Sequence, residues 1–198
     1  MRSKAFGLVL LSLLAFGCSK RSAKDVPVLG QLPEFSLVDQ DEQAFVRDSM
    51  EGNLWVSAFV FTHCQSTCPR LTAHMQGLQS RLSDVPSARF VSVSVDPRND
   101  TPEVIKAYMT KNSLDESNWR FVTGDEEEIR HVVVDGFRVP IGDEDSRAAG
   151  ADDIMHSNSF VLVDDKAQVR GYYRANNDGI GDLERDLRAL ATVVPSMH

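Results

Sequence analysis

The residues with the clearest chemical potential are two cysteines, Cys64 and Cys68, four positions apart and followed by Pro69. In a helical turn, positions i and i+4 share a face with Cα atoms about 6 Å apart, which suits a disulfide or two thiolates on one metal ion. Free N–H groups and the positive dipole end at a helix start favour thiolates over thiols. A permanent disulfide across so short a loop would add little stability. The pair therefore predicts metal binding or thiol exchange.

A metal site on two thiolates needs a third ligand, and the chain has five histidines. His156 precedes a predicted strand, Ser159–Val163, and can face the two thiols from one end of a sheet. His63 adjoins Cys64, but neighbours at a strand end point to opposite sides, so packing or support of the site is the favoured role. The remaining histidines are predicted in helices or at the chain end: His74, His131 and His198.

Two soft sulfurs and one imidazole favour copper, which accepts low coordination as Cu(I) and S,S,N ligation as Cu(II). Zinc is the competing metal, but structural zinc sites usually take four ligands and no fourth is evident in the sequence. Because thiolates are the ligands, a Cys64–Cys68 disulfide must be reduced before the metal binds. The protein is predicted to be a copper carrier, a thiol–disulfide oxidoreductase, or a redox or copper sensor.

Two features count against an oxidoreductase. Such enzymes generally use CxxC, whereas the spacing here is CxxxC. Thioredoxin-like reductases also carry a cis-proline before the strand that faces the dithiol, yet no proline lies between Pro140 and Pro195. His156 stands in that region instead. Whether the protein is an enzyme is left open, with a non-enzymatic copper chaperone favoured.

An α/β fold positions these residues. The almost wholly apolar run Leu54–Phe61 predicts a strand buried on both faces of a sheet, ending just before Cys64. Other predicted elements are a hairpin of 35–38 and 44–46, helices 69–82 and 102–111, strands 89–95 and 119–122, a helix from a capping box at Asp125 and Glu128 to about Gly136, a hairpin of 159–163 and 168–173, and a last helix with Leu183, Leu187, Leu190 and Val194. Ligands of open sheets bind beyond the carboxyl ends of strands, where Cys64 lies.

Composition limits the function further. The chain has 198 residues, enough for one well-buried domain, and a net charge of −8 from 29 acidic and 21 basic residues. This acidic balance disfavours nucleic acid as a partner. Three cysteines are too few for a disulfide scaffold. Residues 142–153 are predicted to form a solvated acidic loop.

Residues 1–17 predict an export signal, with basic residues followed by an apolar run from Ala5 to Phe16 that is too short to span a bilayer. Small residues before Cys18 resemble a bacterial lipoprotein signal, in which Cys18 becomes the lipidated first residue. An uncleaved anchor and ordinary cleavage are the alternatives. We expect a membrane-anchored protein facing the periplasm or cell exterior of a bacterium, with a tether at 18–27 and a folded domain at 28–198.

Four segments together resemble the Sco/SenC family: Gly30–Phe35, Phe61–Pro69, Ser92–Pro102 and His156–Ser157. The resemblance runs from about Gly30 to Val194. It implies a thioredoxin-like fold, a central mixed sheet flanked by helices with an N-terminal hairpin and an inserted strand–helix segment. It also implies a copper site of Cys64, Cys68 and His156 that serves assembly of the binuclear copper centre of cytochrome c oxidase.

The implied partners are the copper subunit of the oxidase, a thiol reductant and a copper donor, with reduction of the oxidase's copper-ligand cysteines as a second role. The sequence departs from the family pattern at Met155, where aspartate is common. Gln43 and Ala167 occupy turns that usually have glycine. Within the segment Ser92–Pro102, three residues are predicted to order the loop beside the site rather than bind metal: Asp96, Arg98 and Asp100.

Overall fold

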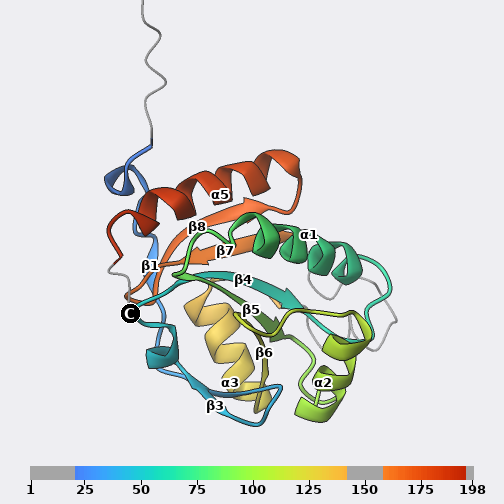
Figure 1. Ribbon diagram of the computed structural model, residues 1–198. Coiled ribbons are helices and arrows are strands. Elements are labelled where there is room, and N and C mark those ends of the chain that lie inside the picture. The colour runs from blue at the N-terminus through green and yellow to red at the C-terminus, as the bar shows by residue number, and fades with distance from the viewer. Residues whose placement is uncertain (1–20, 142–157, 195–198) are drawn as a thin grey trace, which may run out of the picture.

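The computed structural model describes residues 21–141 and 158–194. They form an eight-stranded mixed sheet in the order β1-β8-β7-β4-β5-β6-β2-β3, with helices on both faces (Figure 1). The strands are β1 (Gly30–Gln31), β2 (Ser36–Asp39), β3 (Ala44–Val46), β4 (Leu54–Val60), β5 (Ala88–Ser94), β6 (Trp119–Thr123), β7 (Ser159–Val163) and β8 (Gln168–Arg174). The helices are α1 (Cys68–Arg81), α2 (Pro102–Lys111), α3 (Glu126–Arg130), which continues as a π-helix (His131–Gly136), and α5 (Asn177–Ala191).

β4 is the central strand, and all seven of its residues are buried, as its apolar sequence predicted. It runs parallel to β5, with Val60 opposite Ser94, and antiparallel to β7, with Ser57 opposite Val161. The carboxyl ends of β4, β5 and β6 and the start of β7 therefore lie at one edge of the sheet, called here the carboxyl edge. This is the edge at which open α/β sheets bind their ligands.

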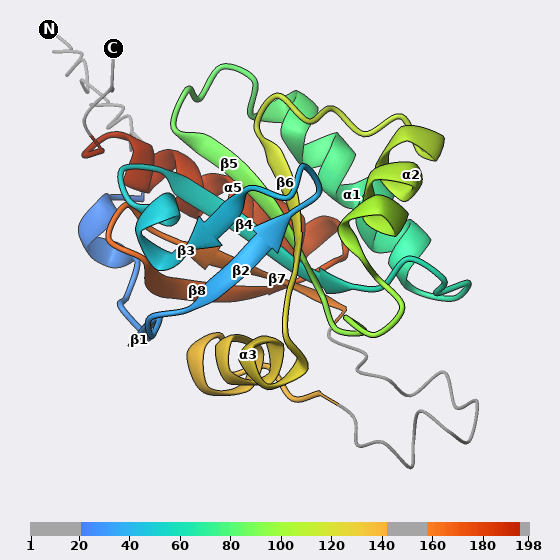
Figure 2. The ribbon, with the colours of Figure 1, turned by 90° about the horizontal axis from the view of Figure 1, so that it is seen from below.

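Alternating side chains of β4 point into two separate cores. Val56 and Ala58 pack with α1, α2 and α5, whereas Trp55 and Phe59 pack with α3 and the β2–β3 hairpin. Figures 1 and 2 show α1 and α5 over one face of the sheet and α3 over the other. The predicted mixed sheet, N-terminal hairpin and inserted strand–helix segment are confirmed. No helix within the described ranges is both long enough and apolar enough to cross a bilayer.

One predicted helix start forms differently. Asp125 caps α3 by accepting the N–H of Glu127, but Glu128 does not close the predicted capping box. Its Oε1 instead accepts the backbone N–H of Ser36 at 2.8 Å. The Glu128 carboxylate thus accepts an N–H from the start of β2 instead of the N–H of the helix cap. This hydrogen bond links the β2–β3 hairpin to α3.

The fold begins earlier than the boundary predicted near Val28. A short 3₁₀ helix, Ala23–Asp25, lies within the predicted tether, and Val26 is only 2% exposed. The guanidinium of Arg170 donates to the carbonyl oxygens of Ala23 (3.4 Å), Val26 and Pro27 (2.9 Å). Residues 21–27 are therefore part of the folded body, because one buried side chain and one arginine far along the chain hold them.

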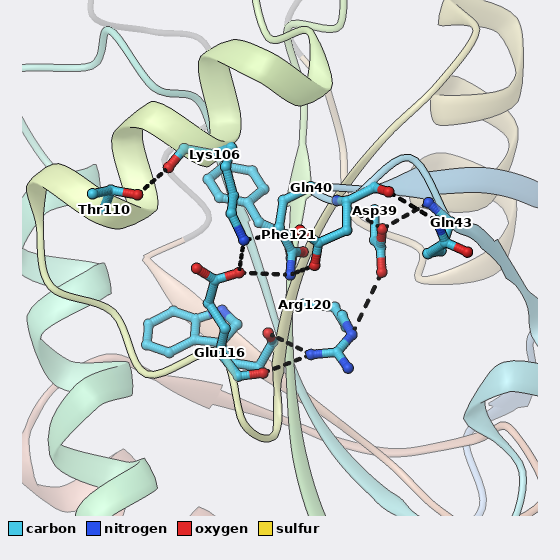
Figure 3. Close-up of polar contacts among 10 residues, drawn as sticks. Asp39, Gln40, Gln43, Lys106, Thr110, Glu116, Arg120 and Phe121 are labelled. Atoms are coloured by element: carbon cyan, nitrogen blue, oxygen red, sulfur yellow. Dashed lines mark hydrogen bonds and ion pairs between the residues drawn. The ribbon is translucent and has the colours of Figure 1, made fainter.

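A polar network fixes α2 against the hairpin and β6 (Figure 3). The amide of Gln40, 3% exposed, accepts the N–H of Phe121 at 3.0 Å and donates to Glu116 at 3.1 Å. Lys106 of α2 contacts Glu116 at 2.6 Å and Asp41 at 2.8 Å. Since α2 follows directly on the loop after β5, the network holds the far end of that loop in place.

Candidate functional site

The two thiols lie at the carboxyl edge, in the connection from β4 to α1. Cys64 is in the loop and Cys68 is the first residue of α1, so the pair joins loop and helix rather than sharing one helical turn. The N–H of Cys68 donates to Cys64 Sγ at 3.4 Å, and Ser66 Oγ lies 3.6 Å from the same sulfur. Both cysteines are free thiols. One of the orphan N–H groups of the helix start thus binds sulfur, as expected for a site that favours thiolate.

The two sulfurs have opposite electrostatic environments. Partial burial raises the pKa of Cys64, but hydrogen bonds from Cys68 and Ser66 outweigh this effect and lower its pKa to about 7. Burial raises the pKa of the Cys68 thiol to about 12, and the neighbouring Cys64 side chain adds to the rise. Cys68 is only 6% exposed. Cys64 is therefore the accessible nucleophile, and Cys68 is a protonated thiol at neutral pH.

This difference predicts selective alkylation. At pH 7 a thiol with pKa about 7 is about half ionised, against about 1% at the ordinary value of 9.0. The lower basicity reduces the intrinsic reactivity of the thiolate about tenfold, so Cys64 should react with iodoacetamide about fivefold faster than an ordinary cysteine. Its rate should level off above about pH 8. Peptide mass mapping of Cys64 and Cys68, with the urea-unfolded chain as control, checks this; faster alkylation of Cys68 would contradict it.

A buried carboxylate holds the loop that carries Cys64. Asp100 is fully buried and accepts the N–H of Thr62 at 3.1 Å and its hydroxyl at 2.6 Å. The hydroxyl of Ser94 donates to Asp100 Oδ2 at 2.6 Å, the same oxygen that accepts the Thr62 N–H, whereas the Thr62 hydroxyl donates to Oδ1. Burial raises the pKa of Asp100, and its hydrogen bonds from Ser94 and Thr62 act in the opposite direction. The predicted loop-ordering role of Asp100 is confirmed by these contacts.

Sequence reasoning missed the other half of this arrangement, Thr62 and Ser94. The available signal was a pair of polar residues at the ends of two neighbouring parallel strands. Because Val60 lies opposite Ser94 in the register, Thr62 comes within reach of the loop that follows β5. The parallel pairing of β4 with β5 thus converts two separate sequence motifs into one site.

His63 lies against the loop that follows β5. Its Nε2 is 3.3 Å from Asp96 Oδ2, and its ring packs 4.7 Å from that of Phe61. Asp96 also accepts from the side chain of Asn99 at 2.9 Å. This matches the packing or supporting role predicted for His63. Arg98, predicted to order the same loop, pairs with Glu126 at 2.7 Å.

The third predicted ligand lies outside the described residues. His156, Met155, Cys18 and His198 all fall in the undescribed ranges, so their predicted roles stay predictions. His74 lies in α1, and His131 Nδ1 is 3.0 Å from Asp135 on its own helix. Among residues 21–141 and 158–194, no three histidine, cysteine or acidic side chains gather as a metal site.

A thioredoxin-like sheet with two free thiols where its central strand meets the first helix defines the structural class of this protein. The fold, the CxxxC loop and the aspartate-bearing loop beside it narrow this class to one family. The chain belongs to the SCO1/SenC family, whose sequence pattern matches residues 29–192.

Individual relatives agree with this assignment. The SCO1 protein homolog of Bacillus subtilis is 32% identical and covers 94% of this chain and 95% of its own. A Stutzerimonas stutzeri protein named for copper binding is 27% identical over 73% of this chain and 69% of its own. The crystal structure of a SCO1/SenC family lipoprotein from Bacillus anthracis has a TM-score of 0.72 and 34% identity, covering 82% of this chain and 95% of its own.

A second solved structure is that of BsSco, described as a Sco family cytochrome c oxidase assembly protein with a disulfide switch. It has a TM-score of 0.73 and 30% identity, and the match covers 84% of this chain and 96% of BsSco. The predicted thioredoxin-like Sco fold is thus confirmed by both sequence and structure.

Proposed function

We propose that this protein binds one copper ion through Cys64, Cys68 and His156 and delivers it during assembly of the binuclear copper centre of cytochrome c oxidase. The observation that carries the proposal is the free thiol pair at the carboxyl edge, joined by the Cys68 N–H to Cys64 Sγ contact of 3.4 Å. Thiolate sulfurs select soft ions such as Cu(I). Family membership supports the same cargo, since one relative is named for copper binding and another for oxidase assembly.

The start of β7 supports His156 as the third ligand. β7 is antiparallel to β4, so Ser159 begins at the edge where β4 ends and the Cys64 loop follows. His156 precedes Ser159 by three residues, a length of chain that spans at most about 10 Å. An imidazole within that distance of the strand start is well placed to complete an S,S,N site.

Membrane attachment is part of the proposal. Cys18, preceded by small residues and an apolar run, is proposed to carry a lipid, and a relative of 34% identity is described as a lipoprotein. In that oxidising location the two thiols form a disulfide unless a reductant acts on them. The proposed partners are therefore a thiol reductant, a copper donor and the copper domain of the oxidase.

The unequal thiols favour a second candidate function, reduction of a disulfide in the recipient. The Cys64 thiolate would attack one sulfur of that disulfide, forming a mixed disulfide and releasing the other sulfur as a thiol. Cys68 would then lose its proton and attack Cys64 Sγ, which breaks the mixed disulfide, forms the Cys64–Cys68 bond and releases the recipient's second sulfur as a thiol. The recipient gains two electrons and two protons, and Cys64 and Cys68 end as a disulfide that a thiol reductant must restore. The pKa of about 7 at Cys64 suits attack by its thiolate, and the nearby Cys68 is the thiol that would resolve the mixed disulfide.

Transfer to an apo copper domain of the oxidase distinguishes the two functions. We expect the copper-loaded protein to leave its copper on the reduced domain, measured as bound copper after the two proteins are separated. The His156→Ala variant should transfer less copper, because it holds the ion more weakly, but should still reduce the disulfide form of the domain. His74→Ala should keep both activities. Full metallation by free copper plus the copper-free protein, with none from the loaded protein, would favour the reductase and contradict delivery.

A further inference from the structure

The first described residue, Arg21, is held by a buried acid. Arg21 Nε lies 2.7 Å from Asp186 Oδ1 in the middle of α5, and the Asp186 side chain is only 5% exposed. The hydroxyl of Tyr173 donates to the second oxygen of Asp186 at 2.8 Å. The Arg21 side chain is 33% exposed, but its partner is buried, so salt screens this ion pair less than a pair between two exposed groups.

The residues that follow Arg21 are held as well. Val26 lies in the core beneath α5, and Arg170 binds the carbonyl oxygens of this segment while pairing with Asp164 at 2.7 Å. Leu29 continues into the sheet by donating its N–H to Val169 at 2.8 Å. Residues 21–29 therefore do not act as a flexible linker between the folded domain and the preceding part of the chain.

The chain enters and leaves the body at the end opposite the thiols. Figures 1 and 2 show the segment that precedes β1 and the C-terminal end of α5 at one end of the molecule and the β4–α1 loop at the other. We call the first the terminal end. Three of the five exposed large apolar side chains of the described ranges lie on the segments beside it: Val28 (55% exposed), Leu29 (40%) and Val193 (65%).

We propose that the terminal end rests against a lipid surface and that the thiols face away from the membrane. The inference rests on the proposed attachment of the chain to a membrane at or before Cys18. Arg21 follows Cys18 by three positions, so a lipid on Cys18 keeps the terminal end within about 10 Å of the anchor. The seven residues of β4 place the thiol loop about 20 Å farther out. A free ten-residue tether would reach about 35 Å and leave the orientation unspecified.

Fluorescence quenching on vesicles tests the orientation. The full lipidated chain, carrying Cys64→Ser and Cys68→Ser, receives a fluorophore at Val193→Cys or at Gln65→Cys, an exposed position in the thiol loop. The vesicles are of phosphatidylcholine with some phosphatidylglycerol and contain nitroxide-labelled lipid. We expect the label at 193 to be quenched at least about threefold more than the label at 65, because the strand length separates them by about 20 Å.

A matched variant tests the role of the pinned segment. Insertion of about ten Gly and Ser residues between Lys20 and Arg21 adds slack without touching the body, so quenching at 193 should fall to the level at 65. Equal quenching of both labels without the insertion would overturn the proposal. Failure of the chain to float with the vesicles would overturn it too, while copper binding by the chain with native thiols shows whether the proposed function survives.

Discussion

Replacing Cys64 or Cys68 with serine is expected to weaken copper binding about a thousandfold. A protein site that binds its ion with about 10 to 16 kcal/mol through four ligands gains about 2.5 to 4 kcal/mol from each. The upper value, which we expect for a soft thiolate on a soft ion, corresponds to about a thousandfold in affinity. A serine hydroxyl does not replace the loss, because it is a hard donor that stays protonated at neutral pH. Anaerobic titration against a Cu(I) chelator measures the affinity of the reduced protein.

The same titration measures the contribution of His156 to copper affinity. His156→Ala should weaken binding less than either serine variant, about a hundredfold, because two thiolates alone still bind Cu(I). It should also leave formation of the Cys64–Cys68 disulfide intact, seen by mass as the loss of two hydrogens. His74→Ala is the control, since His74 lies in α1 with no predicted part in the site. One copper per chain retained in the Cys64→Ser/Cys68→Ser double variant would refute the site.

Asp100→Ala is expected to lower the free energy of unfolding by about 3 kcal/mol. The substitution leaves the N–H and hydroxyl of Thr62 and the hydroxyl of Ser94 without their acceptor. An unsatisfied buried polar group costs about 1 to 3 kcal/mol, and water entering the vacated space offsets part of the sum. Urea denaturation measures the change, and a loss below about 1 kcal/mol would contradict the anchoring role.

A surface aspartate gives the matched control, and pH gives a second readout. Asp182→Ala removes a carboxylate that is 54% exposed and pairs with Arg185, so it should change stability by less than about 0.5 kcal/mol. Burial raises the pKa of Asp100 above its unfolded value. Its contribution to stability is therefore greatest below the unfolded pKa and declines as pH rises through the folded pKa. The difference between the native protein and Asp100→Ala should be larger in acid than at neutral pH.

Much of the fold could be predicted because the hydrophobic patterns and helix caps in the sequence match the burial and helix starts of the folded protein. The apolar run of β4 is buried on both faces, and α2 starts where Thr101 and Pro102 predict it, with Thr101 Oγ1 accepting the N–H of Val104. These elements depend on neighbours in sequence, so their patterns are visible there. The position of Cys64 at the carboxyl edge followed from the same reasoning, since a ligand site lies beyond the end of a central strand.

The errors concern contacts between residues far apart in the chain. The polar composition of 20–24 is typical of a tether, and nothing local indicates that Arg170 will bind the backbone of that segment. Glu128 likewise has the spacing of a capping box, but the N–H of Ser36 takes its carboxylate. Both depend on which elements pack together, which periodicity does not reveal. The His156 ligand stays a prediction because it lies outside the described residues.

The hydrogen bonds from Thr62 to Asp100 limit how much of the β4–α1 loop can change conformation. Thr62 is fastened to the sheet, and Cys68 begins a 14-residue helix, so the backbone free to adjust between them is the five residues His63–Thr67. On the cysteine side of the proposed copper site, release of an ion would then require rearrangement of this one short segment, while the sheet and helices keep their positions. Five residues can rearrange in microseconds or less, far faster than domains move. If the protein delivers copper as proposed, the rate of transfer would then be limited by encounter with the recipient rather than by motion within this protein.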